Sequence, residues 1–219
     1  MISDLLKWGG KRPADASAPG DIRAPKGADG LVVPSKAFPK FLSALSHQPE
    51  PTRVIDFGPV IGGNVEFLGD RLGCKLFIQD LVTEFDRFRK SGATEGLSAA
   101  LESRLLQQED ASVDGVLCWD FFDFLDKASA QVVARHLVRM VKPGGAIMGF
   151  FCTSNVERAP FTKYEIVDDQ SLRHRHHPGA GGQKFTLQNR DIIKMFDGLI
   201  VSDSFLLKSN TREILLRKK

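Results

Sequence analysis

Short apolar runs typical of β-strands alternate with segments of helical periodicity in the middle of this 219-residue chain. The strand-like runs occupy residues 53–57, 74–79, 113–119 and 146–151, with a weaker one at 104–107. Helical patterns occupy residues 64–71 and 129–141, and the second stops at Lys142-Pro143-Gly144-Gly145. This alternation is the signature of crossover connections, so the sequence predicts an α/β fold with a mostly parallel sheet and helices on both faces.

The two ends of the chain depart from this alternation. Residues 9–34 are crowded with Gly, Pro, Ala, Asp and Lys and have no hydrophobic period, so we expect residues 1–34 to form a disordered or loosely ordered leader. A folded domain is expected over residues 35–219, opening with a short helix within 35–45 that Ser35 can cap.

The last third of the chain predicts antiparallel structure. Residues 164–167 and 184–187 fit the arms of an inserted hairpin at about 160–187, with its turn at Pro178-Gly179-Ala180-Gly181-Gly182. Two further strands, at 199–207 and 212–217, are joined by a turn at Ser209-Asn210 and form an antiparallel C-terminal pair.

Composition places the chain among soluble proteins. Hydrophobic residues make up 42% of it, enough for a buried core, but the longest apolar run is shorter than the roughly 18 residues of a membrane-spanning helix. The chain starts without a signal-peptide pattern, and its three cysteines include no CxxC pair. We therefore expect a cytoplasmic protein that does not bind a membrane, and nucleic acid is a disfavoured partner that the sequence leaves open.

The first predicted strand ends in an acid and runs directly into a glycine-rich turn that opens a helix. Asp56 is followed by Gly58, Gly62 and Gly63. Glycines allow close backbone approach and a helix N-terminus offers free N–H groups, so this layout suits a nucleotide. Asp80 closes the next strand about 20 residues later, where a carboxylate can accept hydrogen bonds from ribose hydroxyls.

Structural explanations for the same residues remain open. A tight turn between a strand and a helix requires glycine for steric reasons alone. Asp56 could merely cap that turn, and Asp80 could be the N-cap of a helix over residues 81–89.

These motifs resemble the class I S-adenosylmethionine-dependent methyltransferases, in which an acid opens the glycine-rich first motif and a second acid closes the second strand. Asp114-Gly115-Val116-Leu117-Cys118-Trp119-Asp120 resembles the fourth strand of that family, and Met140-Val141-Lys142-Pro143-Gly144-Gly145 resembles its turn into the fifth. The resemblance covers about residues 52–152. It implies a Rossmann-like, doubly wound sheet that binds S-adenosylmethionine.

The resemblance also implies roles by position. Asp56, Gly58 and Gly62 would contact the methionine end of the cofactor, and Asp80 would bind the ribose. Glu109 or Asp110 would lie near the adenine, and Trp119 and Asp120 would face the transferable methyl group or its acceptor. One position departs from the family, because Val60 stands where a second glycine is usual. Either the loop takes another path and uses Gly62-Gly63 for the close approach, or the pocket is weakened.

The predicted function is S-adenosylmethionine-dependent methyl transfer to an unidentified acceptor. Such transfer can rest on proximity and orientation, so the sequence demands no general base and the catalytic residues stay unassigned. For a hydroxyl acceptor the candidate bases are Asp120, Asp123 and His136.

Two alternatives belong to other functional classes. A methyltransferase-like binding or assembly protein without turnover is motivated by Val60. A nicotinamide-dependent oxidoreductase is disfavoured because Gly58-Pro59-Val60 lacks the usual GxG start.

A basic segment, Arg173-His174-Arg175-His176-His177, follows in the predicted hairpin. Its histidines alone would allow a metal site, but the interleaved arginines repel cations and no partner ligands stand at suitable spacing. We therefore predict no metal and a basic hairpin over the pocket mouth, which would suit an anionic acceptor or be plain solvated surface.

Overall fold

A six-stranded sheet forms the centre of the protein in a computed structural model that describes residues 30–49, 51–92, 97–105 and 108–219. Its strand order is β3-β2-β4-β5-β9-β8. The first four strands are parallel, and β9 and β8 continue the sheet antiparallel. The strands are β2 (Arg53–Asp56), β3 (Lys75–Ile78), β4 (Val113–Trp119), β5 (Val141–Cys152), β8 (Leu199–Leu206) and β9 (Thr211–Lys218). The predicted Rossmann-like α/β class is confirmed.

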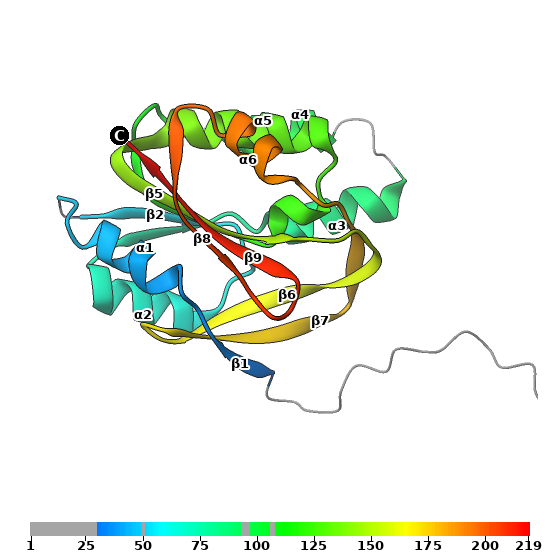
Figure 1. Cartoon of the computed structure of the whole chain (residues 1–219), viewed down its shortest axis with the longest axis horizontal. Helices are drawn as coiled ribbons and strands as arrows, with labels where there is room; N and C mark the ends of the chain where they lie inside the picture. Colours follow the sequence, from blue (N-terminus) through cyan, green and yellow to red (C-terminus); the bar gives the residue numbers. More distant parts are fainter. Residues whose placement is uncertain (1–29, 50, 93–96, 106–107) are drawn as a thin grey trace, which may run out of the picture.

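Helices cover both faces of this sheet (Figure 1). One face packs against α1 (Phe38–Leu45) and α2 (Gly62–Leu72). The other packs against α3 (Leu81–Ser91), α4 (Leu97–Leu105), α5 (Lys127–Met140) and α6 (Asn189–Met195). A 3₁₀ turn, η1 (Phe121–Phe124), follows β4 directly. None of the helices in the described part of the chain could cross a membrane.

Strand β4 lies between the two layers and is buried along its whole length. Val116 and Cys118 point into the core beneath α5, whereas Leu117 and Trp119 point into the core beneath α1. A strand buried on both faces needs an apolar run rather than alternation, which is why this strand stands out in the sequence. Gly115 lets α1 approach closely, since a Cβ there would lie 2.6 Å from Leu45.

A second, three-stranded antiparallel sheet has the order β1-β7-β6. Its members are β1 (Leu31–Pro34), β6 (Val156–Asp168) and β7 (Ser171–Lys184), and β6 packs against α2. Strands β6 and β7 form a long hairpin with its turn at Asp169 and Gln170, where Asp168 Oδ1 accepts the Gln170 N–H at 2.7 Å.

The predicted hairpin turn at residues 178–182 is therefore wrong. That Pro- and Gly-rich segment belongs to β7 and forms an irregularity in the ladder, because Pro160 pairs with Gly181 but Thr162 pairs with His176. A bulge of this kind uses glycine for the same backbone reasons as a turn does.

Two boundaries also change. Leu31–Pro34, predicted as the end of the leader, pairs with β7 and belongs to the folded unit, and the rest of the leader lies outside the described residues. The weak strand predicted at 104–107 begins inside α4, and residues 106–107 are not described. Among the described residues β3 is thus the outermost strand on that side of the sheet. The predicted C-terminal strand pair is present as β8 and β9.

Candidate functional site

The carboxyl ends of β2, β3 and β4 lie side by side because these strands are parallel and in neighbouring positions of the sheet. Asp56 closes β2, Asp80 follows β3, and Trp119 closes β4. Open α/β sheets bind their ligands at this edge, where loops and helix N-termini converge. The structure therefore brings together Asp56, Asp80 and Trp119 from three separate motifs.

Asp56 is buried, with 2% of its surface exposed. Its Oδ1 accepts the N–H of Gly58 at 2.7 Å and the indole Nε1–H of Trp119 at 2.6 Å. Burial raises the pKa of Asp56 to about 6, against the lowering effect of these two donors, and the nearby charge of Asp80 raises it further. The carboxylate thus fixes the start of the glycine-rich loop and the end of β4 at once.

The surroundings of Gly58 differ from those of Gly62 and Gly63. A Cβ on Gly58 would lie 3.0 Å from Asp56 Oδ1 and from the Trp119 ring, so internal packing requires glycine there. Around Gly62 and Gly63 no atom lies within 4 Å of an added Cβ, and no side chain caps the N-terminus of α2 that they open. Their backbone is open to an incoming ligand.

Val60 is 69% exposed, so its side chain points to solvent. It is not among the residues of the described segments that have a positive φ. Val60, the residue that departs from the family motif, therefore adopts an ordinary backbone conformation in this loop.

Asp80 caps α3. Its Oδ1 accepts the Thr83 N–H at 2.9 Å and its Oδ2 the Thr83 hydroxyl at 2.7 Å. The capping role considered from the sequence is thus present. Each carboxylate oxygen has a second lone pair, so the cap leaves acceptor capacity for another donor.

Trp119 adopts a positive φ of 49°, a conformation that is costly for a bulky side chain. Its ring stacks on Tyr164 of β6 with a centroid distance of 5.1 Å and an interplanar angle of 4°. Phe150 stacks on Tyr164 in turn, at 4.9 Å. His174 of β7 meets the Tyr164 ring edge-on at 4.8 Å. The hairpin therefore closes over the end of β4 with an aromatic column.

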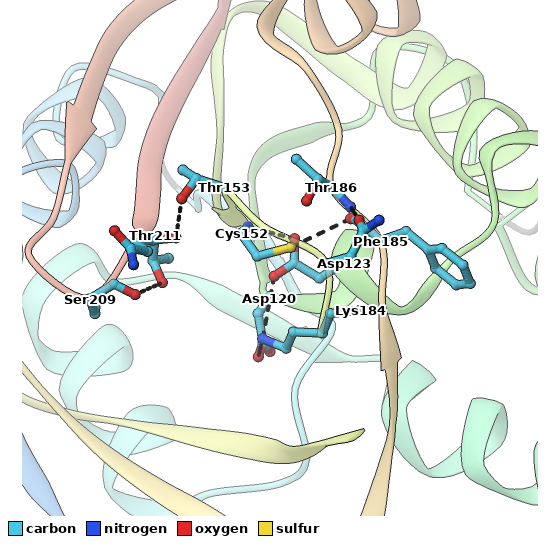
Figure 2. A network of polar contacts seen from close by, with 11 residues as sticks. Asp120, Asp123, Cys152, Thr153, Lys184, Phe185, Thr186, Ser209 and Thr211 are labelled. Atoms are coloured by element: carbon cyan, nitrogen blue, oxygen red, sulfur yellow. Dashed lines mark hydrogen bonds and ion pairs between the residues drawn. The ribbon is translucent and has the colours of Figure 1, made fainter. Parts of the chain in front are cut away.

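Figure 2 shows a polar network that includes Asp120, Asp123 and Lys184. Lys184 Nζ, at the end of β7, lies 2.8 Å from Asp120 Oδ2 and 3.3 Å from Asp123 Oδ2. Asp123 Oδ1 accepts the N–H of Cys152 at 2.9 Å, and its carbonyl oxygen accepts the N–H of Phe185 at 2.7 Å. Asp123 thus holds both segments that flank the hairpin.

The charges in this network are buried. Burial raises the pKa of Asp123 to about 7, although the Lys184 ammonium lowers it, and the charge of Asp120 raises it further. The same two carboxylates raise the pKa of Lys184 against the effect of burial. Burial also raises the pKa of Tyr164 well above its ordinary value, with Asp120 and Asp123 adding to the effect.

Residues 55–149, from the first strand to the middle of β5, match the sequence model of a family described as "Methyltransferase domain". This segment of the chain is similar to a methyltransferase domain. This match agrees with the family that the motifs indicate.

Solved structures similar to this chain are distant in sequence. The glycopeptide N-methyltransferase MtfA complexed with S-adenosyl-L-methionine is 14% identical and covers 91% of this chain and 100% of its own, with a TM-score of 0.46. The PH0226 protein from Pyrococcus horikoshii OT3 is 14% identical, with coverages of 82% and 89% and a TM-score of 0.48. An S-adenosylmethionine-dependent methyltransferase from Clostridium acetobutylicum is 13% identical, with coverages of 83% and 92% and a TM-score of 0.46. Comparison with curated protein sequences finds no match.

Glu109 and Asp110, predicted near adenine, lie at the other edge of the sheet. They precede the first residue of β4, at the amino edge of the sheet, and Asp110 pairs there with Arg139 of α5. Seven residues of strand, on the order of 20 Å, separate them from Trp119. The structure thus places both residues away from the carboxyl edge, where Asp56, Asp80 and Trp119 lie.

Other predicted residues divide between the two edges. Asp120 and Asp123 lie at the carboxyl edge, whereas His136 lies in α5 with Nε2 3.5 Å from a Glu102 oxygen of α4. Lys184 and Tyr164 join the site although nothing in the sequence marks them, since only the hairpin fold brings them to β4. In the described ranges no three His, Cys, Asp or Glu side chains are arranged to hold a metal ion.

Proposed function

We propose that this methyltransferase domain transfers the methyl group of S-adenosylmethionine to an acceptor bound at the carboxyl edge of the sheet, between the end of β4 and the hairpin β6–β7. The observation that carries this proposal is the open, uncapped N-terminus of α2 at Gly62-Gly63, between the strand ends that bear Asp56 and Asp80. It lies inside the segment that matches the methyltransferase family.

The residues at this edge fit the cofactor. No described atom lies within 4 Å of a Cβ added at Gly62 or Gly63. Their small size therefore suits close approach of the protein backbone to a ligand. Free N–H groups at a helix N-terminus suit the negative carboxylate of a methionine moiety. Asp80 retains lone pairs for ribose hydroxyls while it caps α3.

When bound, S-adenosylmethionine supplies a methyl group on a positively charged sulfur. The work of the chain is then to hold the acceptor in line with that methyl and to exclude water. Trp119 and Asp120 stand at the end of β4, and the hairpin covers them through Tyr164 and Lys184. An acceptor that loses a proton on methylation has Asp123 nearby, whose pKa of about 7 suits proton exchange near neutral pH.

A binding protein without turnover is the second candidate. The observation that favours it is the way the chain satisfies its own polar groups, because Trp119 packs on Gly58 and donates to Asp56, and Lys184 binds Asp120. The nicotinamide-dependent alternative is not retained, since the family match is to methyltransferases.

Calorimetric titration of the purified chain with S-adenosylmethionine, S-adenosylhomocysteine and NAD tests the proposal. We expect micromolar binding of both S-adenosyl ligands and none of NAD. Failure of both to bind at millimolar concentration would overturn the enzyme proposal. Binding of S-adenosylhomocysteine equal to or tighter than that of the methyl donor, without methylation of any acceptor in a panel of amines, hydroxyls and carboxylates, would favour the second candidate.

A further inference from the structure

Asn64 connects the glycine-rich loop to the hairpin. It is the third residue of α2, directly after Gly62 and Gly63, and only 1% of its surface is exposed. Its side-chain N–H donates to the carbonyl oxygen of Tyr164 at 2.9 Å, and its Oδ1 accepts the N–H of Ile166 at 2.8 Å. One amide side chain therefore binds two backbone groups of β6.

The two groups belong to the edge of β6 that faces away from β7. Strand β6 ends the order β1-β7-β6, so no neighbouring strand in the described part of the chain pairs with this edge. Asn64 replaces such a strand for one carbonyl and one N–H, both of which would otherwise be buried without a partner. The hairpin is thus held at a fixed position relative to the first turn of α2.

A second link runs through Trp119. Its ring stacks on Tyr164, the residue whose carbonyl Asn64 binds, and its indole N–H donates to Asp56. Asp56 in turn accepts the N–H of Gly58. Movement of β6 therefore acts on both ends of the loop, at Asp56-Gly58 through Trp119 and at Gly62-Gly63 through Asn64.

We propose that Asn64 and Trp119 are positioning residues through which the hairpin β6–β7 sets the conformation of the cofactor loop, so that binding of an S-adenosyl ligand and docking of the hairpin stabilise each other. This inference rests on the proposed function, because it takes the loop over residues 57–63 as the place where the ligand binds. Such coupling is reciprocal. The factor by which the docked hairpin strengthens ligand binding therefore equals the factor by which the ligand strengthens the attachment of the hairpin.

The positive φ of Trp119 fits this role. A bulky residue keeps such a conformation only where its surroundings hold it there. The surroundings are the Asp56 carboxylate on one side and the Tyr164 ring on the other. Loss of either contact releases the end of β4 and, with it, the loop.

Hydrogen exchange of the wild-type chain gives a test that needs no variant. The Ile166 N–H bonds Asn64 at the hairpin, whereas the Arg53 N–H bonds Asp114 at the opposite edge of the sheet. Saturating S-adenosylhomocysteine should slow exchange at Ile166 at least about fivefold more than at Arg53. Equal slowing at both amides would mean that the ligand stabilises the fold as a whole, and would overturn the coupling.

Variants separate the two links. Asn64→Ala removes both bonds to β6, and Trp119→Phe keeps an aromatic ring against Tyr164 but removes the donor to Asp56. Each should weaken S-adenosylhomocysteine binding at least about fivefold, and Asn64→Ala should abolish the ligand-dependent protection of Ile166.

Asn155→Ala is the matched control. Asn155 is exposed and its Oδ1 accepts the N–H of Thr186 at 2.8 Å, so this variant also removes an asparagine contact beside the hairpin but touches nothing in the loop. Its ligand affinity should stay within about twofold of wild type. A folded Asn64→Ala protein with wild-type affinity would overturn the inference while leaving the proposed function intact. Absence of binding to the wild-type chain would overturn both.

Discussion

The two edges of the central sheet carry buried carboxylates in opposite electrostatic settings. At the amino edge Asp114, 0% exposed, binds Lys142 Nζ with both oxygens at 2.9 Å and accepts the Arg53 N–H at 2.8 Å. At the carboxyl edge Asp56, which ends β2 and is 2% exposed, has two neutral donors and no cation among the described residues, and burial raises its pKa to about 6.

The difference separates stability from function within one sheet. At the amino edge the Lys142 ammonium compensates the buried charge of Asp114, so this carboxylate needs no further partner. The carboxyl edge keeps a second carboxyl, Asp123, with a pKa raised to about 7, a Trp119 with positive φ, and glycines that the protein does not require for its own packing. Perturbed pKa values and strained backbones are frequent at functional sites, and the carboxyl edge combines both.

The largest expected effect comes from the amino edge. Asp114→Ala leaves Lys142 without its partner and the Arg53 N–H without an acceptor, so it should lower the free energy of unfolding by about 3 kcal/mol. Urea unfolding followed by circular dichroism measures this loss.

The same variant separates the two edges through ligand binding. Below the unfolding transition, the affinity of Asp114→Ala for S-adenosylhomocysteine should equal that of wild type within about twofold. A tenfold loss of affinity in folded protein would show that the two edges are not independent.

The pH dependence of stability tests the carboxyl edge. Burial raises the pKa of Asp56 and Asp123 from the ordinary 3.8 to about 6 and about 7, so the folded state favours their protonated forms. Their contribution to stability is full below about pH 4 and is lost as the pH rises through 6 and 7.

Between about pH 4.5 and 6 each of these groups should lower the free energy of unfolding by about 1.4 kcal/mol per pH unit. Asp123→Asn removes one of the two carboxyl groups. The stability of this variant should therefore fall with pH less steeply than that of the wild type, by about 1.4 kcal/mol per pH unit. Chemical unfolding at several pH values gives both slopes, and parallel slopes would contradict the raised pKa of Asp123.

The parts of the fold that the sequence predicts correctly are those with strong local patterns. Strand β4 is a continuous apolar run because both its faces are buried, and α5 ends where Lys142-Pro143-Gly144 begins. The turn between β8 and β9 falls at Asn210, whose φ of 53° matches the tolerance of asparagine for this region.

The failures have physical reasons too. Gly181 and its neighbours have the composition of a turn, but the register of β6 against β7 uses them as a bulge, and register depends on contacts far apart in the chain. Glu109 was placed by position in the family resemblance alone, and in the fold it precedes β4 at the amino edge. The sequence does not predict the contacts of Lys184 and Asn64, because a single polar residue carries no periodic signal.

The smallest expected effect concerns Val60. Its exposed side chain and ordinary backbone imply that Val60→Gly only increases the freedom of the unfolded chain, which costs roughly 0.5–1 kcal/mol of stability. Ligand affinity should change less than about threefold, because the open backbone of Gly62-Gly63 provides the close approach. Tenfold tighter binding in calorimetry would instead show that Val60 obstructs the pocket.

The central claim is that the carboxyl edge binds an S-adenosyl ligand with Asp80 on the ribose. Asp80→Ala and Thr83→Ala both weaken the cap of α3, but only the first removes the carboxylate. Both variants should lose up to about 1 kcal/mol of stability. Calorimetric titration with S-adenosylhomocysteine should show at least about tenfold weaker binding for Asp80→Ala and near wild-type binding for Thr83→Ala. Equal affinity in the wild type and both variants would contradict the claim and leave Asp80 with its capping role alone.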